Sequence, residues 1–397
     1  MLQRNQYLEQ IRPHYDSDSV KVVTGMRQSG KSVLMAQIRD ELEKQGKKTV
    51  ALDFADPAVA NACRDAQSLF ACIGNKWKRR RKKTRCYVFL DGVQNLAHWG
   101  AVCRMLTLSS VSLFVAGNGA PLLTEAAKEA LGGEYVEFRV RPFAYKELRA
   151  CAAELGKDAS VEEYFLYGGF PGRLKCADQA ETLRYLGGVN EAAMRDLLGG
   201  GKVQRETLFR RVADFILTQN GRKITANAVH TRLKEEGFSC SINTVMNYLG
   251  GLEAACLVHR LPCYSARACR EKEFHTKIYD EDVALHTVRQ PQDVDLGCNM
   301  ENVVYNELIA MGYTLSGYED QGYSIDFLAR KDGRAYWVQV AESVAKKKVR
   351  EQKFRLLNKL DNARKKVIIT NDGNDYSTGA VEHIRLKDFL MMEDLQG

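Results

Sequence analysis

Short apolar runs alternate with helix-like segments through the first 150 residues of the chain. Side-chain patterns rich in β-branched and aromatic residues predict strands at residues 20–24, 48–54, 86–91, 111–117 and 135–140. Helices are expected at residues 6–13, from Val33 to about Gln45, and around Ala66, Leu69 and Ile73. Because strands that alternate with helices pair in parallel, this pattern predicts an α/β domain built on a parallel sheet.

The middle of the chain has a different pattern, which is mainly helical. Residues 161–198 read as helix with a break at Tyr167–Gly172, and Gly200-Gly201 is a hinge candidate. Residues 207–286 then show three helices, at 208–219, up to Glu236 and after Ser241, followed by strands at 256–258 and 274–279. This order predicts a small helical lid and then a winged helix-turn-helix.

The third helix of a winged helix-turn-helix enters the major groove when the module binds DNA. Its inner face is expected to hold Ile242, Val245, Met246, Leu249 and Leu252. Its outward side chains are expected to be uncharged: Asn243, Thr244, Asn247 and Tyr248. Positive charge lies on the expected wing instead, at Arg260, Arg267, Arg270, Lys272 and Lys277. Since phosphate contacts dominate DNA affinity, both DNA binding and protein docking stay open for this module.

The last hundred residues predict a second, smaller α/β unit. A helix with Glu301 and Glu307 precedes strands at 323–328 and 335–341, a helix at 349–360 and a strand at 367–370. This is the layout of restriction-type nuclease cores, which use an Asp and then Glu-x-Lys to bind Mg²⁺ and activate water. Asp326 is present, but Gln339 and Ala341 stand where Glu and Lys are needed. We therefore expect a nuclease-like fold without nuclease activity; an active nuclease is the least favoured alternative.

The chain carries one motif with specific chemistry, Gly25-Met26-Arg27-Gln28-Ser29-Gly30-Lys31-Ser32, which fits GxxxxGK[ST]. It follows the strand at residues 20–24 and leads through Val33 into a helix, as a phosphate-binding loop requires. The backbone N–H groups of residues 25–33 would surround the phosphates, Lys31 would reach the β- and γ-phosphates, and Ser32 would hold Mg²⁺. The expected ligands are ATP and Mg²⁺.

Asp91 is the second candidate for the metal site. It ends the apolar run at residues 86–91, which is typical of a central strand buried on both faces. Because the carboxyl ends of parallel strands share one edge of the sheet, Asp91 is expected beside the phosphate loop, where it would support Mg²⁺ through water.

Composition narrows the class of protein. With 397 residues, 45% hydrophobic and 27% charged, the chain is long enough for two or three globular domains. No apolar run of about 18 residues and no signal-peptide core occur, so a cytoplasmic protein without a membrane partner is expected.

The 11 cysteines form no CxxC pair, and reduced thiols are favoured over a disulfide framework. Cys256, His259, Cys263 and Cys269 match no common zinc spacing.

The net charge of +8 is concentrated in one segment. Lys76–Arg85 holds eight basic residues and no acidic one, which equals the whole surplus. This segment is either a patch for DNA or another acidic partner, or a solvated connection before a buried strand.

Taken together, the chain resembles the bacterial and archaeal AAA-type ATP-binding proteins that carry a C-terminal restriction-endonuclease-like domain of unknown function. The resemblance covers nearly the whole length and rests on residues 25–32, 89–95, 131–142, 143–148, 168–171, 301–308, 325–327 and 339–341. It implies an AAA-like P-loop NTPase domain at 1–148, a helical lid at 149–205, a winged helix-turn-helix at 206–290 and an inactive nuclease-like domain at 291–397.

The departures from the family pattern concern hydrolysis. Asp91-Gly92 stands where the family has Asp-Glu, so the Walker B glutamate that orients the attacking water is missing. Gly117-Asn118-Gly119 replaces an expected Gly-Ser-Asn turn, and Glu134 replaces an expected arginine. Since the phosphate cradle is intact, we expect ATP to bind and to act as a conformational switch, with weak or absent hydrolysis and no assigned catalytic residue.

Two alternatives to the switch are kept. One is an active ATPase with an atypical base such as Gln94 or Asp56, although Asp56 fits a turn better. The other is a DNA-binding protein with a vestigial ATP site.

Overall fold

The computed structural model describes residues 2–76, 85–109, 111–117, 122–199, 205–265, 270–292, 296–320 and 323–395, with the backbone alone for 265, 270–275 and 320. The chain divides into two compact units. The first holds residues 1–142, 191–202 and 254–256, and the second holds residues 143–190, 203–253 and 257–397.

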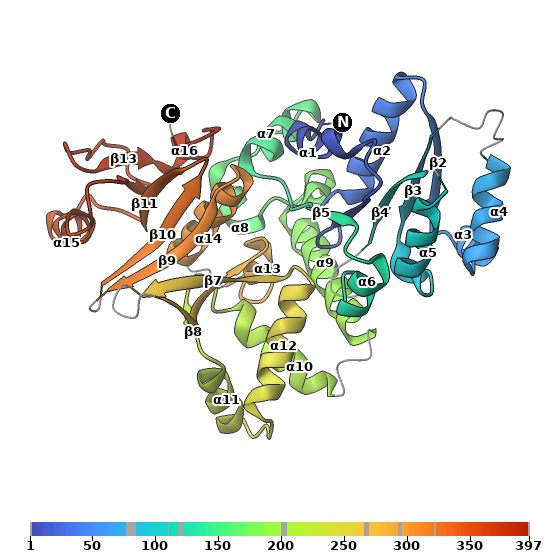
Figure 1. The fold of residues 1–397 in the computed structure, drawn as a ribbon. Coiled ribbons are helices and arrows are strands. Elements are labelled where there is room, and N and C mark those ends of the chain that lie inside the picture. The colour runs from blue at the N-terminus through green and yellow to red at the C-terminus, as the bar shows by residue number, and fades with distance from the viewer. Residues whose placement is uncertain are drawn as a thin grey trace. The chain divides into compact units, whose positions relative to one another are not determined.

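The first unit is built on a sheet of five parallel strands in the order β2-β3-β4-β1-β5 (Figure 1). Its elements are α1 (Asn5–Ile11), η1 (Arg12–His14), β1 (Val20–Thr24), α2 (Lys31–Lys44), β2 (Lys48–Asp53), α3 (Pro57–Ala62), α4 (Ala66–Lys76), β3 (Cys86–Asp91), η2 (Val93–Asn95), α5 (Trp99–Thr107), β4 (Val111–Ala116), α6 (Glu125–Leu131) and β5 (Tyr135–Arg139). The predicted parallel sheet is confirmed, and each expected strand ends within one residue of its prediction.

Burial explains why these strands could be found from sequence. Every residue of β1 and β4 is buried, whereas β2, at the edge of the sheet, alternates between exposed and buried positions. Successive side chains of one strand enter opposite cores, so Val22 packs with α5 and α6 while Val23 packs with α1 and α2. The sheet is therefore covered by helices on both faces, and its polar groups gather at the strand ends.

The second unit contains mainly helices before residue 257 and mainly strands after it. Its elements are α7 (Tyr145–Glu154), α8 (Val161–Tyr167), η3 (Pro171–Lys175), the first part of α9 (Gln179–Gly199), α10 (Glu206–Leu217), β6 (Lys223–Ile224), α11 (Ala226–Glu235), α12 (Ile242–Ala254), β7 (Val258–Ser265), β8 (Arg270–Asp280), α13 (Ala284–Thr287), α14 (Leu296–Ala310), β9 (Thr314–Asp320), β10 (Tyr323–Lys331), β11 (Arg334–Ala341), α15 (Lys347–Asn358), β12 (Lys365–Thr370), β13 (Glu382–Arg385) and α16 (Leu386–Phe389).

Eight strands of the second unit form one sheet in the order β13-β12-β11-β10-β9-β7-β8-β6. The pairs β6–β8, β7–β8, β9–β10 and β10–β11 are antiparallel, and β7–β9, β11–β12 and β12–β13 are parallel. Strands β6, β9 and β13 have no counterpart in the sequence prediction. The sheet runs through both the expected winged helix and the expected nuclease-like segment, because β9 pairs with β7 on one side and with β10 on the other.

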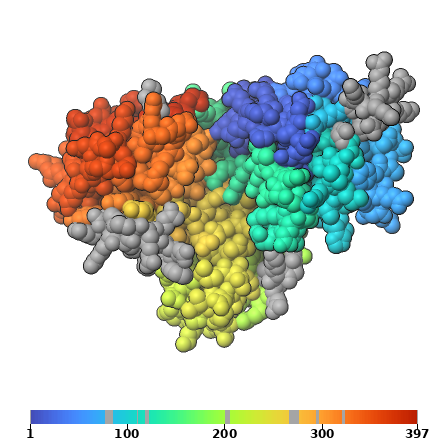
Figure 2. Space-filling model, viewed as in Figure 1, coloured from blue at the N-terminus to red at the C-terminus, as the bar shows by residue number. Residues whose placement is uncertain are grey.

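The helices α10, α11 and α12 pack together and form the yellow-green part of the surface in Figure 2. Tyr248 was expected to face outward, but it is buried and meets Phe209 edge to face, with ring centroids 5.3 Å apart. Val245, Tyr248, Leu249 and Leu252 are spaced i, i+3, i+4 and i+7, so they share one face of α12. Ile242, expected to face inward, is 43% exposed at the start of the helix.

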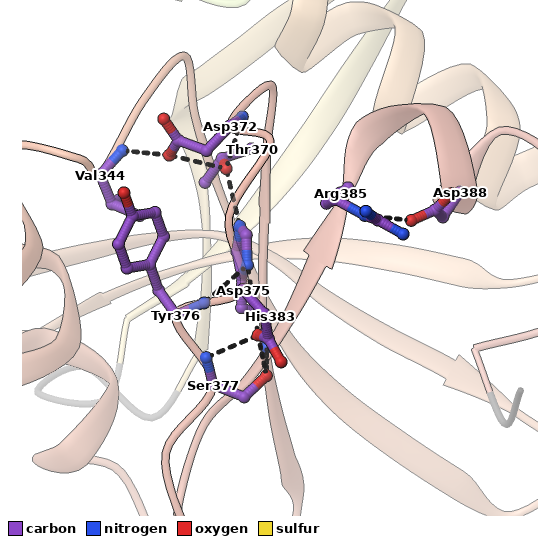
Figure 3. Close-up of polar contacts among 9 residues, drawn as sticks. All are labelled: Val344, Thr370, Asp372, Asp375, Tyr376, Ser377, His383, Arg385 and Asp388. Atoms are coloured by element: carbon purple, nitrogen blue, oxygen red, sulfur yellow. Dashed lines mark hydrogen bonds and ion pairs between the residues drawn. The ribbon is translucent and has the colours of Figure 1, made fainter.

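A polar network fixes the loop between β12 and β13 (Figure 3). The backbone N–H of Tyr376 donates to His383 Nδ1, so the neutral ring of His383 carries its proton on Nε2, which lies 2.7 Å from Thr370 Oγ1. The Thr370 hydroxyl in turn donates to Asp372, which also accepts from the N–H of Val344. Each polar group in this chain of contacts has a protein partner, so the network supports the sheet.

In the part of the chain that the structure describes, no helix is both long enough and apolar enough to span a bilayer.

Candidate nucleotide-binding site

The loop between β1 and α2 has the backbone geometry of a phosphate cradle. Three of its residues have positive φ angles: Gly25 at 137°, Gln28 at 64° and Gly30 at 100°. A Cβ atom at Gly25 would lie 2.1 Å from the carbonyl oxygen of Val140, so only glycine fits this position. Gly30 is the N-cap of α2, and the first N–H groups of a helix have no partner within it. The loop therefore presents free backbone donors and the positive end of the helix dipole.

Lys31 lies inside this loop and is only 5% exposed. Its Nζ donates to the carbonyl oxygens of Gly25, at 3.0 Å, and Met26, at 2.7 Å. Burial lowers the pKa of Lys31 to about 8, although the charge of Asp91 opposes this shift. A buried ammonium that has only carbonyl partners would gain a stronger interaction from the oxygens of a phosphate.

Ser32 and Asp91 come together as the sequence predicts. Both line a cavity of about 190 Å³ between α2 and the ends of β2 and β3; the other lining residues are Met35, Ala36, Arg39, Ala51, Leu52, Asp53 and Phe89. Hydroxyl and carboxylate oxygens are the ligands that Mg²⁺ prefers. Ser29 Oγ, in the loop itself, is buried and has no hydrogen-bond partner in the structure. The donor set therefore fits a phosphate group with a bound Mg²⁺.

Asp53 is a second carboxylate at this edge that sequence reasoning did not assign. It ends β2 and pairs in register with Asp91, which ends β3. Its Oδ1 accepts from the N–H of Ala55 and lies 3.7 Å from the position of a Cβ atom at Gly92. The repeated strand ending, Leu52-Asp53 and Leu90-Asp91, was the available signal, because adjacent parallel strands end at one edge.

Two arginines position the loop. Arg27, within the loop, binds Asp196 of α9 through Nε at 2.5 Å and through Nη2 at 2.9 Å. Arg4 is 3% exposed and donates from Nη1 to the carbonyl oxygens of Ser29 and Arg141. Sequence reasoning missed Arg4 and Asp196, because neither lies near the motif in the chain and no local pattern marks them.

The two candidate bases have different surroundings. Asp56 is the N-cap of α3, and its carboxylate accepts from the N–H of Ala58 at 2.8 Å, which is the turn role that the sequence favoured. Gln94 lies against Gly117 at the end of β4, since a Cβ atom at Gly117 would meet Gln94 Oε1 at 2.7 Å. Of the altered turn after β4, Asn118 and Gly119 lie outside the described residues.

Glu134 lies away from the phosphate loop, which corrects the expectation that it replaces a group acting on the γ-phosphate. It precedes β5, and its carbonyl oxygen accepts from the N–H of Val20 at the start of β1. Because β1 and β5 are parallel, Glu134 lies at the opposite edge of the sheet from Gly25. An arginine at this position would not face the phosphates of its own chain.

The residues proposed for DNA contact are only partly described. Residues 77–84 of the basic run and Arg267 of the wing lie outside the described residues, as does Cys269 of the weighed zinc set. Arg85 binds Asp18 at 2.6 Å, and Arg260 binds Glu253 at 2.6 Å. Lys277 is not on the surface of the wing but largely buried between two carboxylates. Among the described residues, no group of three or more His, Cys, Asp or Glu could hold a metal ion.

This geometry is that of a P-loop nucleotide-binding domain, with a parallel sheet and a glycine-containing phosphate loop at the carboxyl end of β1. Residues 17–149 match a family described as an AAA domain, and residues 158–290 match a family described as a domain of unknown function (DUF8612). The first of these segments contains the parallel sheet, the phosphate loop and Asp91.

The chain is similar to an uncharacterised protein of Haemophilus influenzae, with 28% identity over 402 residues that cover 98% of this chain and 99% of the relative. Solved structures similar to it include a Walker-type ATPase of Pyrococcus abyssi, with a TM-score of 0.48 and 15% identity over 73% of this chain and 96% of that one. Another is AMPPCP-bound DnaA from Aquifex aeolicus, with a TM-score of 0.32 and 13% identity over 62% and 86% of the two chains.

Proposed function

We propose that this protein binds Mg·ATP in the loop of residues 25–33 and uses the nucleotide as a conformational ligand, with weak hydrolysis at most. The backbone of the loop and Lys31 bind the phosphates, and Ser32 and Asp91 hold Mg²⁺. The observation that carries the proposal is the ion pair between Arg27 and Asp196, which joins the phosphate loop to α9.

The ion pair supports a switch because phosphate and Asp196 compete for one guanidinium. Arg27 is bound by both carboxylate oxygens of Asp196, so this geometry uses the same planar fork that would bind a phosphate. A ligand can shift a conformational equilibrium only through its different affinity for the two states. Release of Asp196 when phosphates engage Arg27 supplies such a difference, and it would free α9 to change position.

Replacing Asp196 with asparagine is expected to tighten Mg·ATP binding about fivefold. The half-exposed ion pair is worth up to about 1 kcal/mol, and its removal frees Arg27 for the nucleotide. Calorimetric titration measures the affinity, and limited proteolysis with and without Mg·ATP measures the conformational response, which should shrink. Asp40→Asn is the matched control, because Asp40 is an exposed acid on α2. Unchanged or weaker binding in Asp196→Asn would refute competition for Arg27.

An active ATPase remains the alternative for the same site. Under this alternative, Asp53 is a better candidate for the water-orienting residue than Gln94 or Asp56. The carboxylate of Asp53 lies next to Gly92, where the family pattern has the water-orienting glutamate. Gly92 itself has a φ of +69°, and a Cβ atom there would lie 3.3 Å from the N–H nitrogen of Ala55. Restoring a glutamate at Gly92 would therefore strain the turn, so Asp53 is the better residue to test.

We expect slow ATP turnover that falls about 100-fold in Asp53→Asn, with Mg·ATP affinity changed less than about threefold, because loss of a water-orienting carboxylate affects the chemical step. Binding and phosphate release should be measured on the same purified samples. Asp56→Asn is the control, since Asp56 caps α3. Fast turnover in the wild type would refute weak hydrolysis and define an active enzyme. Equal turnover in wild type and Asp53→Asn would exclude Asp53.

For the rest of the chain we propose a lid at 149–205, a winged helix-turn-helix at 206–290 and an inactive nuclease-like domain at 291–397. The order α10, β6, α11, α12, β7, β8 supports the winged helix, and the order α14, β9, β10, β11, α15, β12 supports the nuclease-like domain. DNA binding with a vestigial ATP site is the other alternative. The two described wing cations, Arg260 and Lys277, already have acidic partners, so their charge does not favour it.

A further inference from the structure

A buried lysine lies between two carboxylates in the second unit. Lys277 of β8 places Nζ 2.6 Å from Glu301 Oε1 of α14 and 2.7 Å from Asp326 Oδ1 of β10. The side chains of Lys277, Glu301 and Asp326 are 16%, 18% and 8% exposed. One ammonium therefore lies between two carboxyl groups that belong to different elements.

Further donors hold both carboxylates of this cluster. Tyr279 OH donates to Glu301 Oε1 at 2.6 Å. Asp326 Oδ2 accepts from Gln339 Nε2 at 2.5 Å and from the N–H of Val340 at 3.0 Å. The other oxygen of the same carboxamide, Gln339 Oε1, is buried and has no hydrogen-bond partner in the structure. The cluster thus places two carboxylates at a single cationic centre, and the Gln339 carboxamide reaches Asp326 through its nitrogen.

Electrostatics show why the cation is needed. Burial raises the pKa of Glu301, and the like charge of Asp326 raises it further. Burial alone would lower the pKa of Lys277, but the two carboxylates outweigh it and the pKa is raised. Two buried carboxylates without a counter-charge would repel each other in a medium that screens charge poorly.

We propose that the ammonium of Lys277 occupies the place of a divalent cation, and that this closes a latent metal site formed by Glu301 and Asp326, with the buried carboxamide of Gln339 beside Asp326. Oxygen ligands from two carboxylates suit Mg²⁺ or Mn²⁺. A lysine that assists phosphodiester cleavage would stand beside a bound metal and face the substrate, whereas Lys277 lies between the two ligands themselves. The site is a structural clamp that ties β8 to α14 and β10.

Replacing Lys277 with methionine tests this proposal, because methionine keeps an unbranched apolar stem and removes the charge. In metal-free buffer without nucleotide, the melting temperature of Lys277→Met is expected to fall below that of the wild type. Mn²⁺ is expected to restore the melting temperature of the variant. One equivalent of Mn²⁺ should bind to the variant at least tenfold more tightly than to the wild type, as measured by calorimetry and by electron paramagnetic resonance. The double variant Lys277→Met, Asp326→Asn should lose this Mn²⁺ response.

Lys331→Met is the matched control, since Lys331 of β10 also forms an ion pair, with Asp394 at 2.7 Å. It should gain no response to Mn²⁺. The proposal is wrong if folded Lys277→Met fails to bind Mn²⁺ more tightly than the wild type. It is also wrong if the wild type binds Mn²⁺ at a site that Asp326→Asn removes, and this titration does not depend on the folding of Lys277→Met.

Discussion

Replacing Lys31 with alanine is expected to weaken Mg·ATP binding about 100-fold or more. Lys31 is the buried cation of the phosphate loop, and charge-assisted hydrogen bonds contribute about 1.5–3 kcal/mol each, so losing two of them weakens binding by at least this factor. The nucleotide-free variant should unfold at the same temperature as the wild type or slightly higher, because the ammonium has only the carbonyl oxygens of Gly25 and Met26 as partners. Calorimetric titration and nucleotide-dependent melting shifts measure these effects.

Lys44→Ala is the control for this experiment, since Lys44 is an exposed lysine in the last turn of the same helix, α2. Its affinity for Mg·ATP should match that of the wild type. Equal affinity in wild type and Lys31→Ala would mean that the loop does not bind phosphates through Lys31, and the nucleotide site would then have to be sought elsewhere or regarded as vestigial.

Replacing Glu307 with alanine is expected to destabilise the second unit by about 3 kcal/mol. Glu307 of α14 is 1% exposed, and its Oε1 accepts from the N–H of Tyr145 at 2.8 Å and from Tyr164 OH at 2.9 Å. Alanine leaves both buried donors without an acceptor, and each unsatisfied group costs about 1–3 kcal/mol. The midpoint of urea unfolding, followed by circular dichroism, measures the loss.

The control, Glu307→Gln, keeps an oxygen acceptor but has no carboxyl group that can ionise. Burial raises the pKa of Glu307 to about 7 from an ordinary 4.5, and repulsion by Glu147 contributes to the same direction. The folded state therefore binds this proton more tightly than the unfolded state, and wild-type stability falls as the pH rises from about 4.5 to about 7. Above pH 7, Glu307→Gln is expected to be about 2 kcal/mol more stable than the wild type, and near pH 5 the two should be similar.

The comparison between wild type and Glu307→Gln isolates this one group. Asp280 and Asp282 also have raised pKa values through burial, but neither changes in the variant, so their contributions cancel in the difference. A pH-independent difference between the two proteins, or a Glu307→Gln variant as unstable as Glu307→Ala, would refute the assignment of Glu307 as a buried acid with a raised pKa.

The candidate nucleotide site could be recognised where its residues are contiguous in the sequence. Gly25, Lys31 and Ser32 belong to one motif, and Asp91 ends a strand whose apolar run marks it as central. Asp53 ends the neighbouring strand and lines the same cavity, but its relation to Gly92 depends on the register of β2 and β3. The partner of Arg27, Asp196, lies 169 residues away in the chain, and no sequence pattern joins the two.

The fold could be predicted where burial alone decides the structure. Strands β3 and β4 are buried over nearly their whole length and were found from their apolar runs. Strand β9 contains Gly317 and ends in acidic residues, and β13 has only four residues, so both depend on pairing with neighbouring strands. Tyr248, predicted to face outward, is buried because it shares one face of α12 with Val245, Leu249 and Leu252.

The sequence by itself determined the parallel α/β domain and its phosphate loop, because both follow from local backbone preferences and from runs of buried side chains. Only the tertiary structure decided that Lys277, once assigned to a wing, lies between Glu301 and Asp326. It also decided that Glu134 lies at the far edge of its sheet. These outcomes depend on strand order and register, which bring distant residues together and which no local pattern in the chain specifies.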